Sequence, residues 1–550
     1  MILRTLRTPG RLLTSVVAGW VLLCGVARSQ TPAREAGIPV TDAVVAAKCG
    51  GCHTRDLAGN MERISRQRTT PEGWQDVVKR MIVIHGASLS PVEARSVVKY
   101  LSTFHGLAPE EAGPVMYEAE RRIREENVAN ESLRKTCTQC HSVARALSWR
   151  RATEEWKQFA GAHAERYKFP ANEEATEFLA KVAPLITPEW TAWNQRNRAE
   201  NPEGRWLVTA TVPGRGKFTG EMRVEAIGGD EFTTSILLTS VRDGSSLVRT
   251  GRSAVYGGYA WRGRSKGDKA PVTADDPQNE TREVMWIAPD QKLAEGRWYW
   301  GQYQELGFDV QLRRPGAEPT LLVTEPVSLK AGAKGARVRV IGDNLPAEGN
   351  PDFGPGVVVQ RIVSRTSREV VAEVDVAPGA ASGTRDVVLG SGRMARAMAI
   401  YDRIDYVKVT PDSAMAAFSD REHPRGYQQF EAIGYQRGAD GKALTEDDVE
   451  LGAVEATWSV EVFYALEGSN PETVGRMTAS GLFVPATHNP DANFDVWVVA
   501  RARTETDPNG KPLTAKAYLV VTVPSYTFNG RRYVRDLDRW VDDGPAADRQ

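Results

Sequence analysis

The sequence predicts a multidomain α + β protein, in which a helical N-terminal third is followed by an antiparallel β-barrel and two β-sandwich domains. Three observations support this prediction. A chain of 550 residues is too long for one hydrophobic core. The hydrophobic periodicity is helical as far as Pro202 and alternates from residue to residue beyond it. Turn-forming residues then recur at the short intervals typical of antiparallel sheets.

Residues 1–29 have the pattern of a secretory signal peptide. Three arginines precede an apolar stretch from Leu12 to Ala27, and Ala27-Arg28-Ser29 fits the small-x-small cleavage pattern. The stretch is short and contains polar residues, which argues against a membrane anchor. We therefore expect export to the periplasm and no membrane attachment after cleavage. Basic and acidic residues number 70 each, so no basic field argues for nucleic acid.

Four of the five cysteines lie in two Cys-x-x-Cys-His motifs, and the fifth, Cys24, lies in the predicted signal peptide. The motifs are Cys49-Gly50-Gly51-Cys52-His53 and Cys137-Thr138-Gln139-Cys140-His141. Two thiols at this spacing can each bond one vinyl group of a porphyrin, and the adjoining imidazole can bind its iron. We predict two covalently bound haem c groups, with attachment sites at Cys49, Cys52, Cys137 and Cys140 and proximal ligands at His53 and His141.

Three other uses of the paired cysteines compete with this interpretation. Structural zinc sites usually combine closer pairs and do not require the histidine that follows each pair here. A redox dithiol is expected in a βαβ context, which this region lacks. Disulfides are compatible with the periplasm but leave His53 and His141 unexplained.

Each motif is followed by a predicted amphipathic helix. Thr70-Pro71 forms a cap with proline at the first helical position, and one face then carries Trp74, Val77, Val78, Met81 and Ile82. The second helix opens at Thr153, and its apolar face carries Trp156, Phe159, Ala160 and His163. The two segments therefore form an internal repeat.

The repeat locates the distal haem ligands. Met81 follows Trp74 by the same interval that separates His163 from Trp156, and a predicted helix cap follows each, Ser90 and Asn172. We expect Met81 and His163 to be the distal ligands. Two alternatives stay open for the first haem. Met81 could be an ordinary core residue, and His85, one helical turn on, could be the ligand in its place. His105 is a third candidate, but its position beside Gly106 is typical of a helix C-terminus.

From residue 201 to 315 the sequence predicts an antiparallel β-barrel. Apolar and polar residues alternate from Phe218 to Ala226, and Gly228-Gly229-Asp230 forms a turn. Other strand-like runs are Arg205–Val212, Glu231–Leu238, Thr281–Ile287, Arg297–Tyr303 and Phe308–Arg313. Short strands at this spacing are typical of a barrel or a sandwich.

Beyond a linker at Pro315–Pro319, residues 319–401 and 402–525 resemble two immunoglobulin-like domains. Strand-like runs in the second are Thr457–Val460, Ser480–Phe483 and Asp495–Ala500. Residues 526–550 form a charged and aromatic tail, which either docks on a partner or is a frayed end. With the signal peptide at 1–29 and a dihaem domain at 30–200, these boundaries divide the whole chain.

Two haem motifs followed by a barrel and two immunoglobulin-like domains resemble the alpha subunit family of quinohaemoprotein amine dehydrogenases. The resemblance covers essentially the whole mature chain and depends on domain order, length and the linked haem motifs. It implies an electron-transfer subunit of an oxidoreductase, in which amine oxidation takes place on a partner. It also implies a heterotrimer with a β-propeller subunit and a small subunit carrying cysteine tryptophylquinone. The implied electron acceptor is a small cytochrome c or a blue copper protein.

Two alternatives come from other functional classes. An independent dihaem enzyme, such as a peroxidase, would show a five-coordinate haem. A haem-bearing surface protein that binds a polymer or another cell would purify without small subunits. The amine and the first haem to receive electrons are not determined by the sequence.

Overall fold

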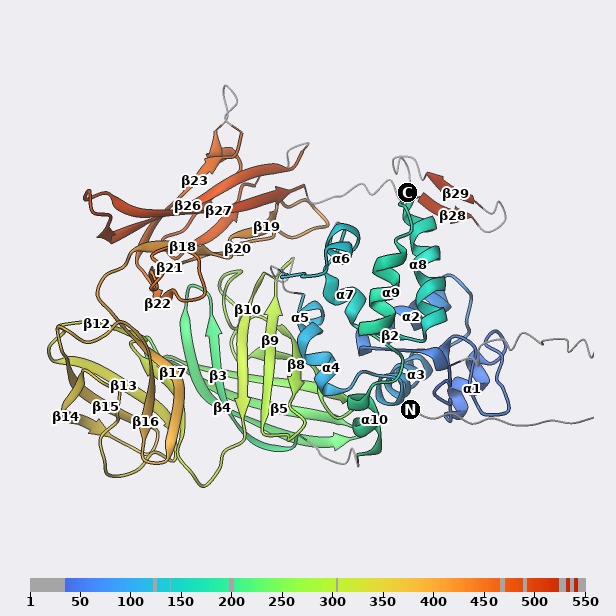
Figure 1. Cartoon of the computed structure of the whole chain (residues 1–550), viewed down its shortest axis with the longest axis horizontal. Coiled ribbons are helices and arrows are strands. Elements are labelled where there is room, and N and C mark those ends of the chain that lie inside the picture. The colour runs from blue at the N-terminus through green and yellow to red at the C-terminus, as the bar shows by residue number, and fades with distance from the viewer. Residues whose placement is uncertain are drawn as a thin grey trace, which may run out of the picture.

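The computed structural model describes residues 35–121, 126–138, 140–196, 202–302, 305–464, 470–487 and 492–523, together with the backbone of 531–534 and 539–542. The predicted signal peptide lies outside the described residues. Figure 1 shows helices α1–α10 on one side of a β-barrel and the sheets built from β11–β17 on the other.

The N-terminal third is helical, as predicted. Its α-helices are α1 (Ala43–Cys49), α2 (Pro71–Val83), α3 (Pro91–Phe104), α4 (Pro109–Ala112), α5 (Met116–Ala119), α6 (Glu131–Thr136), α7 (Val143–Leu147), α8 (Thr153–Tyr167), α9 (Glu173–Val182) and α10 (Pro188–Gln195), with 3-10 turns at Ile64–Arg66 and Gly113–Val115. The predicted caps are confirmed. Thr70 accepts a hydrogen bond from the Gly73 amide, Ser90 and Glu93 form a capping box, and Asn172 caps α9.

Two short strands join the halves of this helical part around a local two-fold. Strand β1 (Gln67–Thr69) pairs antiparallel with β2 (Trp149–Arg151), and Arg68 lies opposite Arg150 at the centre. Each half then repeats one contact. The Trp74 indole donates a hydrogen bond of 2.8 Å to the carbonyl of His105, the C-cap of α3. The Trp156 indole donates one of 2.9 Å to the carbonyl of Ala183, the C-cap of α9. The predicted repeat is therefore a repeat in three dimensions.

A buried carboxylate bridges the two halves at the centre of this pair. Glu111, on α4, accepts two hydrogen bonds from Arg68, at 2.7 and 2.9 Å, and one from Arg150 at 3.2 Å. The Arg68 side chain is 0% exposed and that of Glu111 is 5% exposed. Burial alone would raise the pKa of Glu111, but the hydrogen bonds and charge of the two arginines outweigh it and hold this pKa below its usual value.

We expect Glu111→Gln to destabilise the helical part by about 3–5 kcal/mol at neutral pH, because it leaves two buried guanidinium groups without their carboxylate. The pKa of Glu111 is lowered by folding, so its contribution is complete above the unfolded value of 4.5 and is lost as pH falls below it. Unfolding followed by helical circular dichroism at several pH values measures both effects. Glu110→Gln, at the exposed neighbouring position, is the matched control. An equal stability of the two variants at pH 7 would contradict the bridging role.

The barrel predicted for residues 201–315 is present and closed. Its strands are β3 (Gly204–Val212), β4 (Gly216–Gly228), β5 (Glu231–Ser240), β6 (Ser246–Tyr256), β7 (Ala260–Gly267), β8 (Thr281–Ile287), β9 (Leu293–Trp300) and β10 (Leu306–Arg313). Neighbours in sequence pair antiparallel, and β10 returns to pair with β3. Strands β6 and β7 were not predicted from the sequence. The run predicted at Arg297–Tyr303 begins and ends later than β9.

The helical part and the barrel share one hydrophobic core. Trp190 and Trp193 of α10 belong to the same buried cluster as Trp206 and Trp261 of the barrel. The Trp286 indole donates to the Pro109 carbonyl at 2.7 Å, and Arg262 of β7 forms an ion pair with Glu72 of α2. Because these contacts tie α2 and α4 directly to strands, the barrel holds the helices in place.

Residues 320–401 form two sheets around one apolar cluster. Their strands are β11 (Thr320–Glu325), β12 (Ser328–Lys330), β13 (Ala336–Asp343), β14 (Val357–Arg365), β15 (Glu369–Val376), β16 (Gly383–Leu389) and β17 (Gly392–Tyr401), in the orders β11-β13-β15-β14 and β12-β17-β16. Arg205 of the barrel reaches Asp343 of β13 at 2.8 Å, which fixes these sheets to the barrel.

The following strands share a separate apolar cluster. They are β18 (Tyr406–Thr410), β19 (Ser413–Ala417), β20 (Gln428–Gln429), β21 (Glu431–Gln436), β22 (Val449–Ala453), β23 (Ala456–Val462), β24 (Gly475–Met477), β25 (Leu482–Pro485), β26 (Phe494–Thr506) and β27 (Pro512–Thr522), with a 3-10 turn at Pro471–Thr473. The predicted strand runs at Thr457–Val460 and Asp495–Ala500 lie in β23 and β26. In the tail, β28 (Arg531–Val534) pairs with β29 (Arg539–Asp542).

Candidate functional site

The first motif follows directly on α1. Asp42 caps this helix, and the amides of Cys52 and His53 donate to the Cys49 carbonyl at 3.2 and 2.9 Å. The Cys49 side chain packs against an apolar cluster, whereas Cys52 is exposed. The His53 Nδ1 atom lies 3.1 Å from the Glu62 carbonyl oxygen. A proton donated there leaves Nε2 as the metal-binding nitrogen.

The second motif repeats this arrangement on α6. Asn130 caps the helix, Cys137 packs against a second apolar cluster and Cys140 is exposed. The His141 Nδ1 atom lies 2.7 Å from the Ser142 carbonyl oxygen, so its Nε2 is again the free nitrogen. Burial raises the pKa of both half-buried thiols, Cys49 and Cys137.

His141 and His163 face each other across a short gap. Their ring centroids are 6.3 Å apart, with an angle of 70° between the ring planes. Two imidazoles that bind one metal ion through nitrogens about 2 Å from it have centroids roughly 6 Å apart. Burial lowers the pKa of His163, and the nearby His141 lowers it further, which favours the neutral ligand form. The predicted pair therefore fits a six-coordinate haem iron.

Aromatic rings surround His163 on its own helix and just beyond it. Phe159 stacks on the imidazole at 5.3 Å, Tyr167 lies at 4.7 Å and Phe169 at 5.6 Å. The helical pattern predicted Phe159 on the same face as His163 but did not single out Tyr167. Tyr167 follows His163 by four residues and therefore lies on that face too. These rings form apolar walls of the kind that suit a porphyrin.

Met81, the predicted distal ligand of the first site, lies in the last turn of α2 and is half-buried. It occupies the position on α2 that His163 occupies on α8, counted from the two tryptophans that make equivalent hydrogen bonds. His85 lies beyond the end of α2 and is exposed. The neighbouring Val83 and Ile84 are also exposed, at 71% and 53%, and a bound porphyrin would cover such apolar surface.

His105 ends α3, as predicted, and is fully buried. Its ring meets Trp74 edge-on at 6.3 Å, and both ring nitrogens lack a hydrogen-bond partner among the described residues. Burial, followed by the charge of Arg68, lowers the pKa of His105 to about 3. His105 is therefore a neutral core residue behind Trp74.

The four cysteines of the two motifs do not converge on one centre. Within the described ranges, no three or more His, Cys, Asp or Glu side chains gather closely enough to bind a metal ion. The donor set of each half, two thiols and an oriented imidazole, fits haem attachment in both places. No helix in the described part of the chain is both long and apolar enough to cross a bilayer.

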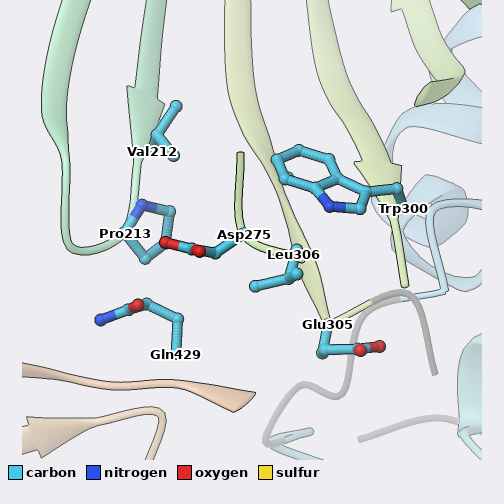
Figure 2. Close-up of a pocket in the computed structure, with 8 residues that line it drawn as sticks. Val212, Pro213, Asp275, Trp300, Glu305, Leu306 and Gln429 are labelled. Atoms are coloured by element: carbon cyan, nitrogen blue, oxygen red, sulfur yellow. The ribbon is translucent and has the colours of Figure 1, made fainter. Parts of the chain in front are cut away.

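A shallow pocket lies elsewhere, where the end of the barrel meets β20. The empty space there is about 240 Å³ and includes open solvent, so it is not an enclosed cavity, and Figure 2 shows Trp300, Asp275 and Gln429 around it. The Trp300 indole already donates to the Ala274 carbonyl at 2.7 Å, and the Gln429 amide donates to the Ser480 carbonyl at 2.6 Å. The pocket therefore lies at the contact between the barrel and the sheet that contains β20.

Family models match almost the whole chain in order. Quinohemoprotein amine dehydrogenase A, alpha subunit, haem binding, matches residues 40–178, which contain both motifs and both predicted distal ligands. Alpha subunit domain II matches residues 199–315, domain III matches 318–402 and domain IV matches 407–531.

No curated protein matches the chain. Several solved structures resemble parts of the chain at low sequence identity. A redesigned β-barrel, mFAP1, bound to DFHBI, has 14% identity and a TM-score of 0.17, covering 20% of this chain and 94% of its own. The Yersinia pseudotuberculosis adhesin InvE has 12% identity and a TM-score of 0.13, covering 36% and 58%. The Bacteroides ovatus glucan-utilization protein SGBP-B has 12% identity and a TM-score of 0.18, covering 63% and 66%.

Proposed function

Because the chain belongs to the alpha subunit family of quinohemoprotein amine dehydrogenases, we propose that it is the dihaem electron-transfer subunit of such a complex. It passes electrons from a quinone on a partner subunit to a soluble acceptor. The observation that carries this proposal is the match of four family models in order along the chain. The first of them covers the helical region with the two haem motifs. Cys49, Cys52 and His53 would hold one haem, and Cys137, Cys140 and His141 the other.

A bound haem c supplies one-electron redox chemistry at its iron. The chain's residues fix the ligand orientation, because a hydrogen bond from each proximal Nδ1 to a backbone carbonyl sets the tautomer. His163 would be the distal ligand of the second haem, and Met81 that of the first. The β1–β2 pair and the Glu111 bridge keep the two halves in one fixed arrangement. Ligands that are held in fixed positions lower the reorganisation energy of each electron transfer.

The cysteine content of the chain supports amine oxidation on another subunit. Every cysteine outside the predicted signal peptide lies in a haem motif, so none remains to build a cysteine tryptophylquinone on this chain. The proposed partners are a small quinone-bearing subunit and a β-propeller subunit, and the proposed acceptor is a small cytochrome c or a blue copper protein. We also propose periplasmic location after cleavage at residue 29, and immunoglobulin-like domains at 319–401 and 402–525.

The experiment is to add a primary amine anaerobically to two preparations of the tagged chain, one purified with its native companions and one expressed alone with haem loaded. We expect the haem bands to become reduced in the first preparation only. Mass analysis of the first should also identify a small crosslinked subunit. Reduction of the partner-free chain by amine would contradict the proposal and favour an independent enzyme. A native preparation without companion subunits would favour a surface-binding protein.

A further inference from the structure

Arg151, at the end of β2, carries a buried charge with no paired anion. The residue is 7% exposed, and its Nη1 donates to the neutral side-chain oxygen of Gln67 at 2.5 Å. Its Nε is buried without a hydrogen-bond partner, and no ion pair to Arg151 exists among the residues described. A buried guanidinium without a carboxylate is costly, so this position calls for an anion that is not part of the protein.

Aromatic rings hold the Arg151 guanidinium in place. Its central carbon lies 4.3 Å from the ring centroid of Trp149, 4.7 Å from Phe159 and 5.5 Å from Trp156. Cation–π contacts of this kind fix the direction of the side chain without neutralising its charge. The remaining hydrogen-bond donors are therefore preorganised for an acceptor.

One ring separates this charge from the predicted iron ligand. Phe159 contacts the Arg151 guanidinium on one side and stacks on the His163 imidazole on the other, at 5.3 Å and 27°. The missing anion is thus expected beside the second haem site. A haem c has used its vinyl groups in the thioether links, and its acidic groups are the two propionates.

The two halves of the helical part differ at this point. The local two-fold that places Arg68 opposite Arg150 makes Thr69 the counterpart of Arg151. Thr69 is uncharged, and its hydroxyl donates to the Ser148 carbonyl at 2.9 Å. The charges of Arg80 and Arg63, from the first half, act on Arg151 across the boundary, and Glu155 is the acidic side chain that acts on it. The first half therefore brings further positive charge toward Arg151.

We propose that Arg151 binds a propionate of the second haem, the one attached at Cys137 and Cys140. This inference depends on the proposed dihaem function. Arg151 is a positioning residue, and its planar fork suits a carboxylate. A fixed positive charge near a haem favours the reduced iron, so the reduction potential of the second haem should be higher with Arg151 than with a neutral side chain at this position.

The test is spectroelectrochemistry of the haem-loaded chain carrying Arg151→Gln. We expect the equilibrium constant for reducing the second haem to fall by about tenfold, which equals about 59 mV for one electron. The potential should also become pH-dependent near neutrality, because the released propionate can then take up a proton. Arg151→Lys, which keeps the charge, should restore most of the potential. Lys181→Gln removes an exposed positive charge of the same half, on α9, and should leave the potential unchanged.

An unchanged potential and an unchanged pH profile in a folded Arg151→Gln variant would overturn the inference. The unmodified chain gives a second test if that variant does not fold. Its second haem should keep a constant potential through the neutral range, and a pH-dependent potential there would also overturn the inference. These outcomes differ from failure of the proposed function, in which no haem would be found at Cys137 and Cys140.

Discussion

His163→Ala is expected to convert the second haem from a six-coordinate to a five-coordinate, high-spin centre. The His141 and His163 rings lie 6.3 Å apart, the spacing of two imidazoles that share one iron, and α8 contains no other histidine and no methionine or cysteine. Absorption and electron paramagnetic resonance spectra report the spin state. The variant should bind carbon monoxide when reduced, and added imidazole should restore the low-spin spectrum.

The control for this substitution is Tyr167→Phe, which keeps the ring that contacts His163 at 4.7 Å and removes only a hydroxyl. It should remain low-spin. A low-spin, six-coordinate second haem in His163→Ala would show that another residue binds the iron. The equivalence of the two halves would then fail as a guide to ligands.

Met81→His is expected to lower the potential of the first haem sharply. Thioether sulfur is a weaker donor than imidazole and stabilises reduced iron, and axial ligands can set haem potentials over a range of about 0.8 V. The variant should also lose the absorption band of iron–methionine ligation, while the second haem keeps its potential. In the unmodified chain we therefore expect the first haem to be the higher-potential site.

His85→Ala is the matched substitution, because His85 is exposed beyond the end of α2. It should leave both potentials and the methionine band unchanged. Loss of a ligand in His85→Ala together with no change in Met81→Ala would make both haems bis-histidine and would contradict the assignment of Met81.

Local signals explain what the sequence could predict. Three predicted helix starts depend on contacts within three residues, and all three are present in the structure: Thr70-Pro71, the Ser90 capping box and Asn172. The spacing of Met81 and His163 from their tryptophans is likewise local. Other contacts join segments that no local sequence pattern pairs. These are the β1–β2 pairing, the hydrogen bonds of Glu111 to two arginines, and the aromatic rings around Arg151.

The missed strand β6 has a specific physical cause. Arg249 takes an inward position in this strand that an apolar residue would normally fill, and it is 0% exposed. Its guanidinium donates to the Ser265 carbonyl at 2.8 Å and to the Thr281 hydroxyl at 2.9 Å. These partners lie on β7 and β8, so the alternating pattern is broken by a side chain whose stability comes from neighbouring strands.

Mass spectrometry of the denatured mature chain tests most directly the claim that it carries two covalent haems. We expect the mass of the polypeptide plus two haems, and peptide fragments that place one haem on Cys49 and Cys52 and the other on Cys137 and Cys140. Removal of noncovalent haem by acid and solvent beforehand should leave this mass unchanged. A polypeptide mass without haem, with free thiols, disulfides or bound zinc at these four cysteines, would contradict the account.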